Sequence, residues 1–429
     1  MAKLLFVTVG VGQNADIVSG IEYLIRRENP EKVIFIGSKE SREKIYEPHL
    51  IGKELIKKCQ PEWELLSDEN DYRKIYDDCK QVIKRHQIQY PLDKNEYIAD
   101  FTTGTKAMSA GLTLAAFAKE FQNLSYISGK RENGRVISGE EFQFTVPLRW
   151  VYLDRDLKKI TELFNHYQFS AAAELTQAFF SYRQDREFQN KVNFLMKLIR
   201  GFSAWDRFDF KEANKIFTEL TRDFSDFLRG LGLKNKLDQI NQNLHRCSED
   251  PYSDILAADL FENALRRIEE WKYDDAVARL YRLIEFLAQK ILTLEFKIDS
   301  DDVNLSLIPE SIRENARGIL PESRNGKIQI SMEKTFKLLE LLKHPLGQRF
   351  LSDSEMKELQ RKRNYSILAH GFYPVGKESC EKLRNLVESY LNPPMIQDFQ
   401  KFRESCRFPN LELNSLEKLF EEKEEVGAL

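Results

Sequence analysis

The sequence predicts an α/β domain at the N-terminus and an all-α region after it. Short apolar runs alternate with amphipathic stretches over residues 1–150, the pattern of a parallel sheet covered by helices on both faces. Strand signals nearly vanish after about residue 155, where helical patterns take over. The chain has 429 residues, which exceeds what one compact core holds. Together these observations predict a doubly wound, Rossmann-like domain followed by helical domains.

Each strand of the α/β domain is predicted from a short apolar run, and each helix from an amphipathic stretch between two runs. The predicted strands are Lys3–Val9, Lys32–Gly37, Glu62–Leu66, Glu96–Phe101 and Leu124–Ser128. The predicted helices are Asp16–Arg27, Ser41–Lys58 and Tyr72–His86. Residues Arg135–Val146 are predicted as a closing hairpin strand that leads out of the domain.

Three segments of the helical region share one pattern, in which an aromatic residue and a short polar turn precede an Ala-rich helix. They are residues 166–175, 207–217 and 271–281. The pattern is typical of tetratricopeptide-like helical hairpins. Because the three segments are unequally spaced along the chain, it is equally possible that they are ordinary turns of a helical bundle.

Helix and breaker signals predict the rest of the chain. Helices are expected at Ile255–Phe296, Met332–Lys343, Glu355–His370 and Lys377–Leu391, with a loop over residues 297–330. Asp250 and Pro251 indicate a boundary. The expected domains are residues 1–150, a helical linker domain over 151–250, a helical bundle over 251–392 and a charged, peripheral C-terminal extension over 393–429.

Composition limits the class of protein. The net charge of −3 means that a nucleic-acid partner would have to be bound by a local basic patch. No window approaches the ~18 apolar residues of a membrane span, and the N-terminus is typical of a buried strand rather than a signal peptide. Five scattered cysteines and six histidines without a metal-binding spacing predict neither a disulfide framework nor a metal site. We expect a cytoplasmic protein with no membrane partner.

Glycines and polar residues follow two of the predicted strands. They are Thr8, Gly10, Gly12, Gln13 and Asn14 after the first strand, and Thr102, Thr103, Gly104, Thr105 and Lys106 after the fourth. Ligands of open α/β sheets bind beyond the carboxyl ends of the strands, where glycines allow close approach and helix N-termini favour phosphates. Ala15 replaces the third glycine of GxGxxG, and there is no Walker motif, which disfavours a plain NAD or ATP site. Tight turns with a Thr-rich helix cap are the alternative interpretation.

A second cluster lies near the C-terminus and consists of Arg363, Asn364 and His370. Residues seven apart face the same way on a helix, so Arg363 and His370 are expected to share a face that Asn364 flanks. Arginine binds phosphate through a fork of donors, and histidine exchanges a proton near neutral pH. Gly371 is expected to end the helix. A chance pair on a solvated basic face is the alternative interpretation.

Both clusters lie in strings that resemble known families. DFTTGTKAMSAGL (residues 100–112), with the loop after the first strand, resembles the fourth-strand signature of CRISPR-associated Rossmann-fold (CARF) domains. RNYSILAHG (residues 363–371) resembles the R-N-x5-H motif of HEPN ribonucleases, and ARLYRLIEFLAQKIL (residues 278–292) looks like the first long helix of such a bundle. With both strings in one chain, the protein resembles the CARF–HEPN ancillary ribonucleases of type III CRISPR systems, the Csm/Csx group, although residues 155–250 match their simplest members poorly.

This resemblance implies an endoribonuclease of antiviral defence that cuts single-stranded RNA without a metal ion. The activator would be a cyclic oligoadenylate, with cyclic tetra-adenylate expected first, bound by the two loops across a two-fold homodimer interface. Arg363, Asn364 and His370 would form a composite catalytic site where two HEPN domains meet. Neither DNA nor a further cofactor would take part.

Two other functions remain open from the sequence. The chain could sense the ring and recruit a partner without cutting RNA, or it could cut the ring itself through Thr102, Thr103 and Lys106. A transcriptional regulator is disfavoured, because the sequence has no helix-turn-helix signature or basic recognition helix.

Overall fold

The structure is a computed structural model that describes residues 2–12, 14–132, 135–321, 327–368, 371–393 and 395–421, with the backbone alone for residues 14, 130–132 and 135–141. The chain divides into two compact units, Met1–Arg155 and Asp156–Leu429. Each unit is considered by itself below. Within the described residues, no helix combines the length and the apolar character that crossing a membrane requires.

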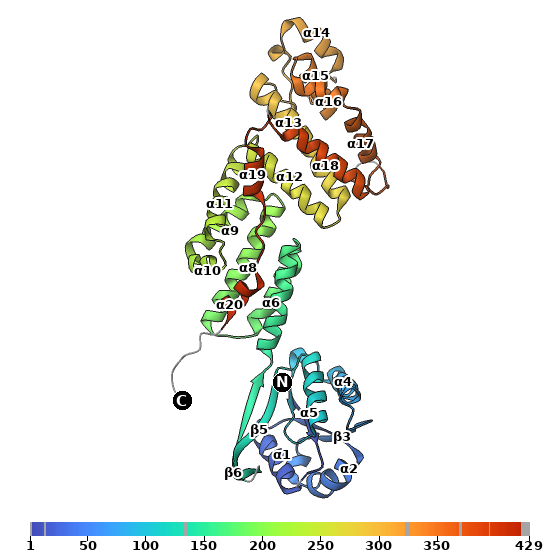
Figure 1. The fold of residues 1–429 in the computed structure, drawn as a ribbon, viewed down its shortest axis with the longest axis vertical. Helices are drawn as coiled ribbons and strands as arrows, with labels where there is room; N and C mark the ends of the chain where they lie inside the picture. Colours follow the sequence, from blue (N-terminus) through green and yellow to red (C-terminus); the bar gives the residue numbers. More distant parts are fainter. Residues whose placement is uncertain are drawn as a thin grey trace. The chain divides into compact units, whose positions relative to one another are not determined.

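The first unit contains a six-stranded sheet in the order β3-β2-β1-β4-β5-β6 (Figure 1). Its strands are β1 (Lys3–Val9), β2 (Lys32–Gly37), β3 (Pro61–Leu65), β4 (Glu96–Asp100), β5 (Asn123–Glu132) and β6 (Arg135–Pro147). The first five are parallel, and β6 pairs antiparallel with β5. This order confirms the predicted doubly wound α/β domain and its closing hairpin strand.

Helices cover both faces of the sheet, with α4 and α5 on one side and α1 and α2 (Lys39–Ser41) on the other (Figure 1). The helices are α1 (Asn14–Glu28), α4 (Tyr72–Gln89), the 3₁₀ turn η2 (Leu92–Lys94) and α5 (Lys106–Ala118). Alternate residues of β1 serve the two layers. Leu5, Val7 and Val9 join the core under α1. On the other face, the ring of Phe6 lies 5.7 Å from that of Tyr97 and 5.2 Å from that of Phe121.

The single helix predicted over Ser41–Lys58 is wrong. This segment consists of α2 (Lys39–Ser41), the π-helix η1 (Arg42–Leu50) and α3 (Glu54–Lys57). Pro48 lies inside the π-helix and has no N–H to donate, so a regular α-helical ladder cannot run through it. The amide of Ile51 accordingly reaches back to the carbonyl of Tyr46, at 3.0 Å.

The second unit is helical, as predicted. The first group of helices is α6 (Arg149–Asn165), in which the division between the units falls, then α7 (Phe169–Ala178), η3 (Phe179–Ser181), α8 (Arg186–Asp206), α9 (Phe210–Asp223), α10 (Ser225–Gly230) and α11 (Lys234–Glu249). The second group is α12 (Asp254–Glu269), α13 (Tyr273–Phe296), η4 (Leu305–Leu307), α14 (Glu310–Ile319), α15 (Met332–Leu341), α16 (Pro345–Ser352), α17 (Ser354–Asn364) and α18 (Lys377–Leu391). The prediction of a loop over residues 297–330 is wrong in part, because this segment contains α14. Pro309 directly precedes α14 and marks its start instead of breaking a helix.

The three segments with a shared sequence pattern adopt one shared turn. Their aromatic residues are all left-handed, with φ of 60° at Tyr167, 62° at Phe208 and 61° at Trp271. The amide of the next residue bonds to a carbonyl five positions back, at 2.8, 3.0 and 2.9 Å respectively. The alanine five positions after each aromatic residue is fully buried, namely Ala172, Ala213 and Ala276. The turn therefore repeats in structure, although its spacing along the chain is irregular.

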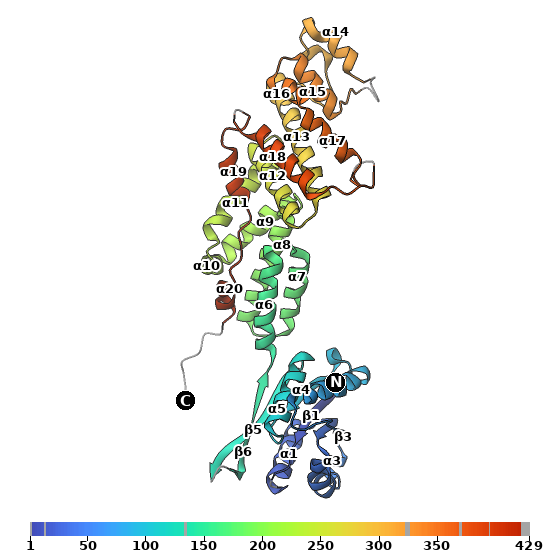
Figure 2. The same cartoon turned by 45° about the vertical axis from the view of Figure 1, so that its right-hand side comes forward.

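The C-terminal segment was expected to be peripheral, and this expectation is wrong. It forms α19 (Phe399–Cys406) and α20 (Leu413–Phe420), and Figure 2 shows α19 beside α11 and α12. Arg403 of α19 is buried between the carboxylates of Glu262, at 2.7 Å, and Glu388, at 2.5 Å. The ring of Phe408 lies 4.5 Å from that of Trp205. The apolar residues among the charged ones thus bind this segment to helices far away in the sequence.

Candidate functional site

The two predicted nucleotide loops meet at the carboxyl edge of the sheet, because β1 and β4 are parallel neighbours. The amide of Gly10 donates a hydrogen bond to the carbonyl of Thr103 at 2.8 Å. The hydroxyl of Thr103 donates to the carbonyl of Thr8 at 2.5 Å. The strand order also reverses here, between β1 and β4, which is where open α/β sheets bind ligands.

Two of the glycines are required by this close approach. A Cβ at Gly104 would lie 2.4 Å from the hydroxyl oxygen of Thr8, and a Cβ at Gly10 would lie 2.8 Å from the carbonyl oxygen of Thr103. Gly12 is less constrained, since a Cβ there would meet only the side chain of Ile17, at 3.2 Å. The first two glycines therefore let the loops touch, while exposed Gly12 leaves backbone open to a ligand.

The threonine hydroxyls of the second loop already have partners within the protein. Thr102 accepts a hydrogen bond from the amide of Ile127 at 2.9 Å, and Thr105 caps α5 by accepting from the amide of Met108 at 3.2 Å. Thr105 thus acts as the helix cap of the alternative interpretation, whereas the hydroxyls of Thr102 and Thr103 join the loop to β5 and β1. The exposed ammonium of Lys106, in the first turn of α5, is the group that this loop offers an anion.

Asp100 shapes this loop from below and was not among the predicted site residues. Its carboxylate is buried and accepts a hydrogen bond from the amide of Thr102 at 3.0 Å. Burial raises the pKa of this carboxyl, although the hydrogen bonds from Thr102 and Ser125 oppose the shift. Its position at the end of a buried strand, directly before the threonines, is the sequence signal that could have found it.

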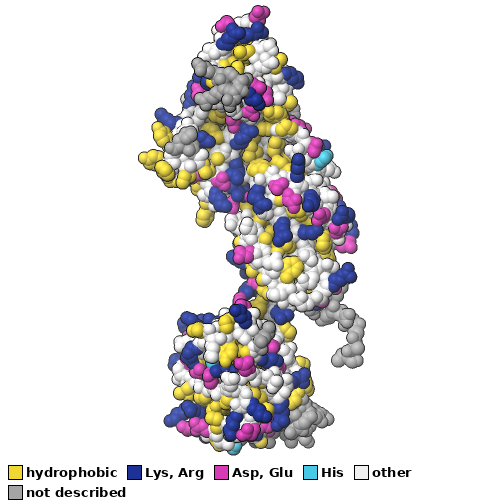
Figure 3. All heavy atoms as spheres, turned by 180° about the vertical axis from the view of Figure 1, so that it is seen from behind, with side chains coloured by type: hydrophobic (Ala, Val, Ile, Leu, Met, Phe, Trp, Pro, Cys, Tyr) yellow, Lys and Arg dark blue, Asp and Glu magenta, His cyan; other side chains and the backbone are white. Residues whose placement is uncertain are grey.

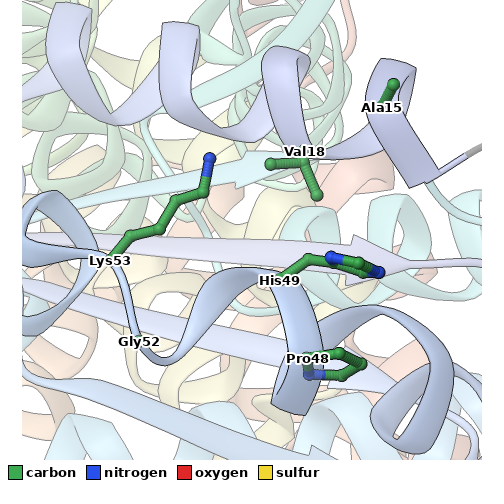
Figure 4. A pocket seen from close by; sticks show the side chains of 6 residues that line it. All are labelled: Ala15, Val18, Pro48, His49, Gly52 and Lys53. Carbon is green, nitrogen blue, oxygen red and sulfur yellow. The ribbon is translucent and has the colours of Figure 1, made fainter.

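Gln13 lies outside the described residues, and Asn14 is described only by its backbone, as the first residue of α1. Directly after it, Ala15 begins the lining of a pocket of about 490 Å³ between α1 and η1 (Figure 4). Val18 and the ring of His49 face this hollow, and Pro48 closes it from below. The ammonium group of Lys53 points towards α1, where it pairs with Glu22.

The helix predicted over Glu355–His370 is wrong beyond Asn364, where α17 ends. The prediction that Arg363 and His370 share a face therefore loses its helical basis. The amide of Tyr365 bonds to the carbonyl of Lys362, and the chain then folds back on itself. The amide of Gly371 donates to the carbonyl of Ser366 at 3.1 Å, and that of Tyr373 to the carbonyl of Tyr365 at 3.0 Å. His370 lies outside the described residues.

The sequence predicts that Gly371 ends a helix, but this residue instead packs closely against the backbone of Tyr365. A Cβ on Gly371 would lie 2.1 Å from the carbonyl oxygen of Tyr365. Only a glycine fits against the backbone at this distance, so the residue after His370 closes the turn.

Arg363 and Asn364 lie together at the end of α17. The guanidinium of Arg363 lies 5.7 Å from the ring centre of Tyr281, and its Nη1 donates to the side-chain oxygen of Asn364 at 3.4 Å. Among the described residues, neither the buried Nε of Arg363 nor the buried hydroxyl of Tyr281 has a hydrogen-bond partner. Burial raises the pKa of the Tyr281 phenol. An arginine with an unused donor is suited to an incoming phosphate.

Tyr281 is the residue of this cluster that sequence reasoning missed. It lies on α13, within the helix ARLYRLIEFLAQKIL that looks like the first long helix of a HEPN bundle. It is only 5 % exposed. An aromatic residue at helical spacing is typical of an ordinary core residue. What distinguishes Tyr281 is its buried hydroxyl, which has no hydrogen-bond partner in the part of the chain that the structure describes.

Three side chains in the α/β unit could in principle bind a metal ion. The ligand atoms of Glu62, Glu64 and His86 lie within 4.8 Å of one another. Lys32 pairs with Glu62 at 2.5 Å, and Arg85 pairs with Glu64 at 2.7 Å. Burial lowers the pKa of His86 against the opposing effect of Glu62. Because two cations already balance the two carboxylates, this is an ion-pair cluster beside β3 rather than a metal site.

Comparisons with known proteins agree with this architecture. Residues 245–393 match the family of the Csm6 HEPN domain, and residues 152–244 match that of the Csm6 6H domain. The structure is similar to that of Enterococcus italicus Csm6 bound to cyclic hexa-2′-fluoro-hexa-dAMP, with a TM-score of 0.59 and 16 % identity over 98 % of this chain and 100 % of that chain. At this identity the similarity concerns the fold. No curated protein sequence matches significantly.

A Rossmann-like domain followed by 6H and HEPN helical domains defines the CARF–HEPN class of CRISPR-associated nucleases. The HEPN match contains Arg363 and Asn364 at the end of α17, and Tyr281 on α13. The chain belongs to the Csm6 family of this class.

Proposed function

We propose that the protein is a metal-independent endoribonuclease that cuts single-stranded RNA when a cyclic oligoadenylate binds its CARF domain. The observation that carries this proposal is the match of residues 245–393 to the Csm6 HEPN domain, within which the R-N-x5-H motif occupies residues 363–370. The buried Nε of Arg363, which has no hydrogen-bond partner among the described residues, and the adjacent asparagine support phosphate binding at this motif.

The ring binds where the loops after β1 and β4 meet. Gly12, Gln13 and Asn14 of the first loop and the residues from Thr103 to Lys106 of the second contribute backbone amides and one ammonium group. Gly10 and Thr102, whose amides donate to Thr103 and Asp100, hold the loops in place for the ring. The pocket lined by Ala15, Val18 and Pro48 directly adjoins Asn14 and offers apolar walls to a base. The similar Enterococcus italicus protein was bound to a ring of six nucleotides. We therefore test cyclic hexa-adenylate as activator beside the cyclic tetra-adenylate expected from the sequence.

The reaction uses the 2′-hydroxyl of the RNA as nucleophile. His370 accepts its proton, or protonates the departing 5′-oxygen, while the 2′-oxygen forms a bond to phosphorus and the bond to the 5′-oxygen breaks. Arg363 stabilises the charge that develops on the phosphorane-like transition state, and Asn364 orients the catalytic side chains. One chain supplies one such histidine, so a homodimer that joins two motifs in one cleft supplies both acid and base. The products carry a 2′,3′-cyclic phosphate and a 5′-hydroxyl.

Activation follows from linkage between the two domains. A ring that binds the CARF loops can activate cleavage only by favouring the arrangement in which the HEPN cleft is competent.

In the experiment, full-length protein is incubated with RNA and a cyclic oligoadenylate in EDTA buffer. The termini of the RNA products are then identified, and the cyclic oligoadenylate is checked for degradation. Cyclic phosphate termini that disappear in His370→Ala support the proposal. Loss of cleavage in EDTA contradicts the metal-independent reaction. Intact RNA with a bound ring points to a recruiting module, and ring degradation that survives His370→Ala points to a ring nuclease.

A further inference from the structure

A pocket of about 470 Å³ opens directly beside the Arg363–Asn364 cluster. It is lined by Lys362 and Tyr365 at the end of α17, by the segment from Tyr373 to Gly376, and by Ser379 at the start of α18. We call it the tyrosine pocket after its two aromatic residues. Neither the motif analysis nor the proposed reaction uses it.

The frame of the tyrosine pocket is fixed by backbone contacts. The hydrogen bond from the amide of Tyr373 to the carbonyl of Tyr365 joins the two tyrosines, and Ser366 between them is buried. The close approach of Gly371 to Tyr365 holds the same turn. The amide of Val375 donates to the carboxylate of Asp274 on α13, at 3.3 Å to either oxygen. The two rings therefore extend from one anchored frame, so little conformational entropy is lost when a ligand binds between them.

The rings themselves are open to solvent. Tyr365 is 58 % exposed and Tyr373 is 73 % exposed. Further exposed apolar side chains lie next to them in the sequence, namely Ile367, Leu368 and Phe372. In Figure 3, hydrophobic side chains gather at the left-hand edge of the helical unit, in the region of the turn after α17. Exposed apolar groups concentrated in one place on a surface indicate a binding site.

Positive charge accompanies the aromatic rings. The last turn of α17 carries Arg361, Lys362 and Arg363. The ammonium of Lys362 pairs with Glu358 at 2.9 Å, but both side chains are about half exposed, at 49 % and 55 %. An exposed pair of this kind contributes little and is easily exchanged for another anion. Aromatic rings with an adjacent cation are the combination by which proteins bind single-stranded nucleic acid, through stacked bases and neutralised phosphates.

We propose that the tyrosine pocket binds one base of single-stranded RNA next to the phosphate held by Arg363, with Tyr365 and Tyr373 stacking on the base and Lys362 facing its phosphate. This inference rests on the proposed RNA substrate and names the residues that position it. A hollow with two aromatic rings, a hydroxyl and an ammonium offers a base both stacking and polar contacts.

The test measures binding and not cleavage, so that it stands apart from the proposed reaction. A short fluorescein-labelled 2′-O-methyl RNA of mixed sequence lacks the free 2′-hydroxyl and cannot be cut. Its Kd for full-length protein with the activating ring is measured by anisotropy. Tyr365→Ala and Tyr373→Ala each weaken binding about tenfold, the loss of one stacked base. Tyr365→Phe and Tyr373→Phe retain stacking and bind like the wild type. Tyr72→Ala, at a tyrosine of α4 that is 61 % exposed, leaves the Kd unchanged.

A set of the same RNA with one abasic position at a time identifies the base. We expect one abasic position to raise the Kd of the wild type as much as Tyr365→Ala raises the Kd for intact RNA. The Kd of Tyr365→Ala for that abasic RNA should then be no higher than its Kd for intact RNA. Equal Kd values for the Ala and Phe variants, or abasic losses that simply add to Tyr365→Ala at every position, would overturn the proposal. A smaller mass by light scattering for the Ala variants alone would assign the patch to an interface between copies. If the RNA binds as expected but the natural RNA is not cut, the proposed reaction fails and the pocket stands.

Discussion

The amide of Gly10 and the carbonyl of Thr103 are joined by a hydrogen bond of 2.8 Å, so the two loops of the nucleotide site form one continuous surface. The hydroxyl of Thr103 returns to the carbonyl of Thr8 and closes the arrangement. A ligand that contacts one loop therefore acts on the ends of both β1 and β4.

Substitution of Gly104 by alanine is expected to weaken ring binding and to destabilise the α/β unit. The added Cβ would lie 2.4 Å from the Thr8 hydroxyl oxygen, so one loop must move away from the other. We expect a cost of about 1–3 kcal/mol in the free energy of unfolding, measured by urea denaturation. Gly230→Ala is the control, because a Cβ there meets nothing within 4 Å. Equal stability of the two variants would show that the loops do not need their close contact.

Lys106→Ala is expected to weaken binding of the cyclic oligoadenylate roughly tenfold at low salt. Its exposed ammonium lies in the first turn of α5 and offsets phosphate charge. The difference should shrink as salt rises, because screening weakens exposed charges. Calorimetric titration at two salt concentrations measures it, with Lys84→Ala on α4 as control. An effect of Lys106→Ala that does not depend on salt would contradict an electrostatic part for this side chain.

Tyr281→Leu is expected to reduce kcat for RNA about tenfold without changing the affinity for the cyclic oligoadenylate. The ring of Tyr281 supports the guanidinium of Arg363 at 5.7 Å, and a lost cation–π contact of about 0.5–2 kcal/mol frees the arginine to turn. Tyr281→Phe keeps the ring and removes only a hydroxyl that has no partner in the described structure, so its kcat should stay near that of the wild type. Similar losses of kcat in both variants would argue that catalysis depends on the hydroxyl of Tyr281 and not on its aromatic ring.

Asp259 predicts a pH dependence of stability in the helical unit. Burial raises its pKa to about 7, while the guanidinium of Arg266 and the hydrogen bond from Trp205 oppose the shift. The folded carboxyl therefore holds its proton more tightly than the unfolded one, so this group contributes stability that declines as pH rises from about 4 to about 7 and is flat above. The slope should not exceed about 1.4 kcal/mol per pH unit.

Asp259→Asn keeps the acceptor for the Trp205 indole N–H, at 3.1 Å, and removes the titration. Urea denaturation at pH 5, 6, 7 and 8 should show a falling midpoint for the helical transition of the wild type and a flatter one for the variant. Parallel profiles would contradict the raised pKa.

Arg403→Ala is expected to destabilise the helical unit by about 3–5 kcal/mol, because it removes a buried cation from the buried carboxylate of Glu262 and the partly buried carboxylate of Glu388. Among the described residues, these carboxylates then keep only longer ion pairs, with Arg407 and Arg384. Arg407→Ala is the matched control. This arginine reaches the same Glu262 carboxylate at 3.6 Å, but its side chain is 57 % exposed, so its loss should cost less than about 1 kcal/mol. Thermal denaturation compares the two, and a small effect of Arg403→Ala would show that this ion-pair cluster does not anchor the C-terminal segment.

The sequence predicts the sheet well, because buried parallel strands such as Lys32–Gly37 are unbroken apolar runs. It predicts less well where one local feature overrides the periodicity, as at Pro48 in the π-helix and Pro309 before α14. The turn after Asn364 depends on Gly371 packing against the carbonyl of Tyr365, a contact that no helical pattern announces. The site residues follow the same division. Strand ends locate Gly10 and Thr103 and would also have located Asp100, the last residue of β4. Tyr281 emerges only from its burial and from a hydroxyl without a hydrogen-bond partner among the described residues.

The central claim is that ring binding at one domain controls a histidine-dependent ribonuclease in the other. The measurement that tests it most directly follows a fluorogenic RNA in EDTA with full-length protein, with and without cyclic tetra- or hexa-adenylate, for the wild type and His370→Ala. We predict cleavage by the wild type with one ring only, no cleavage without a ring, and none by His370→Ala although the ring still binds. Ring-dependent cleavage of equal rate in His370→Ala, or the same rate with and without either ring, would contradict the account.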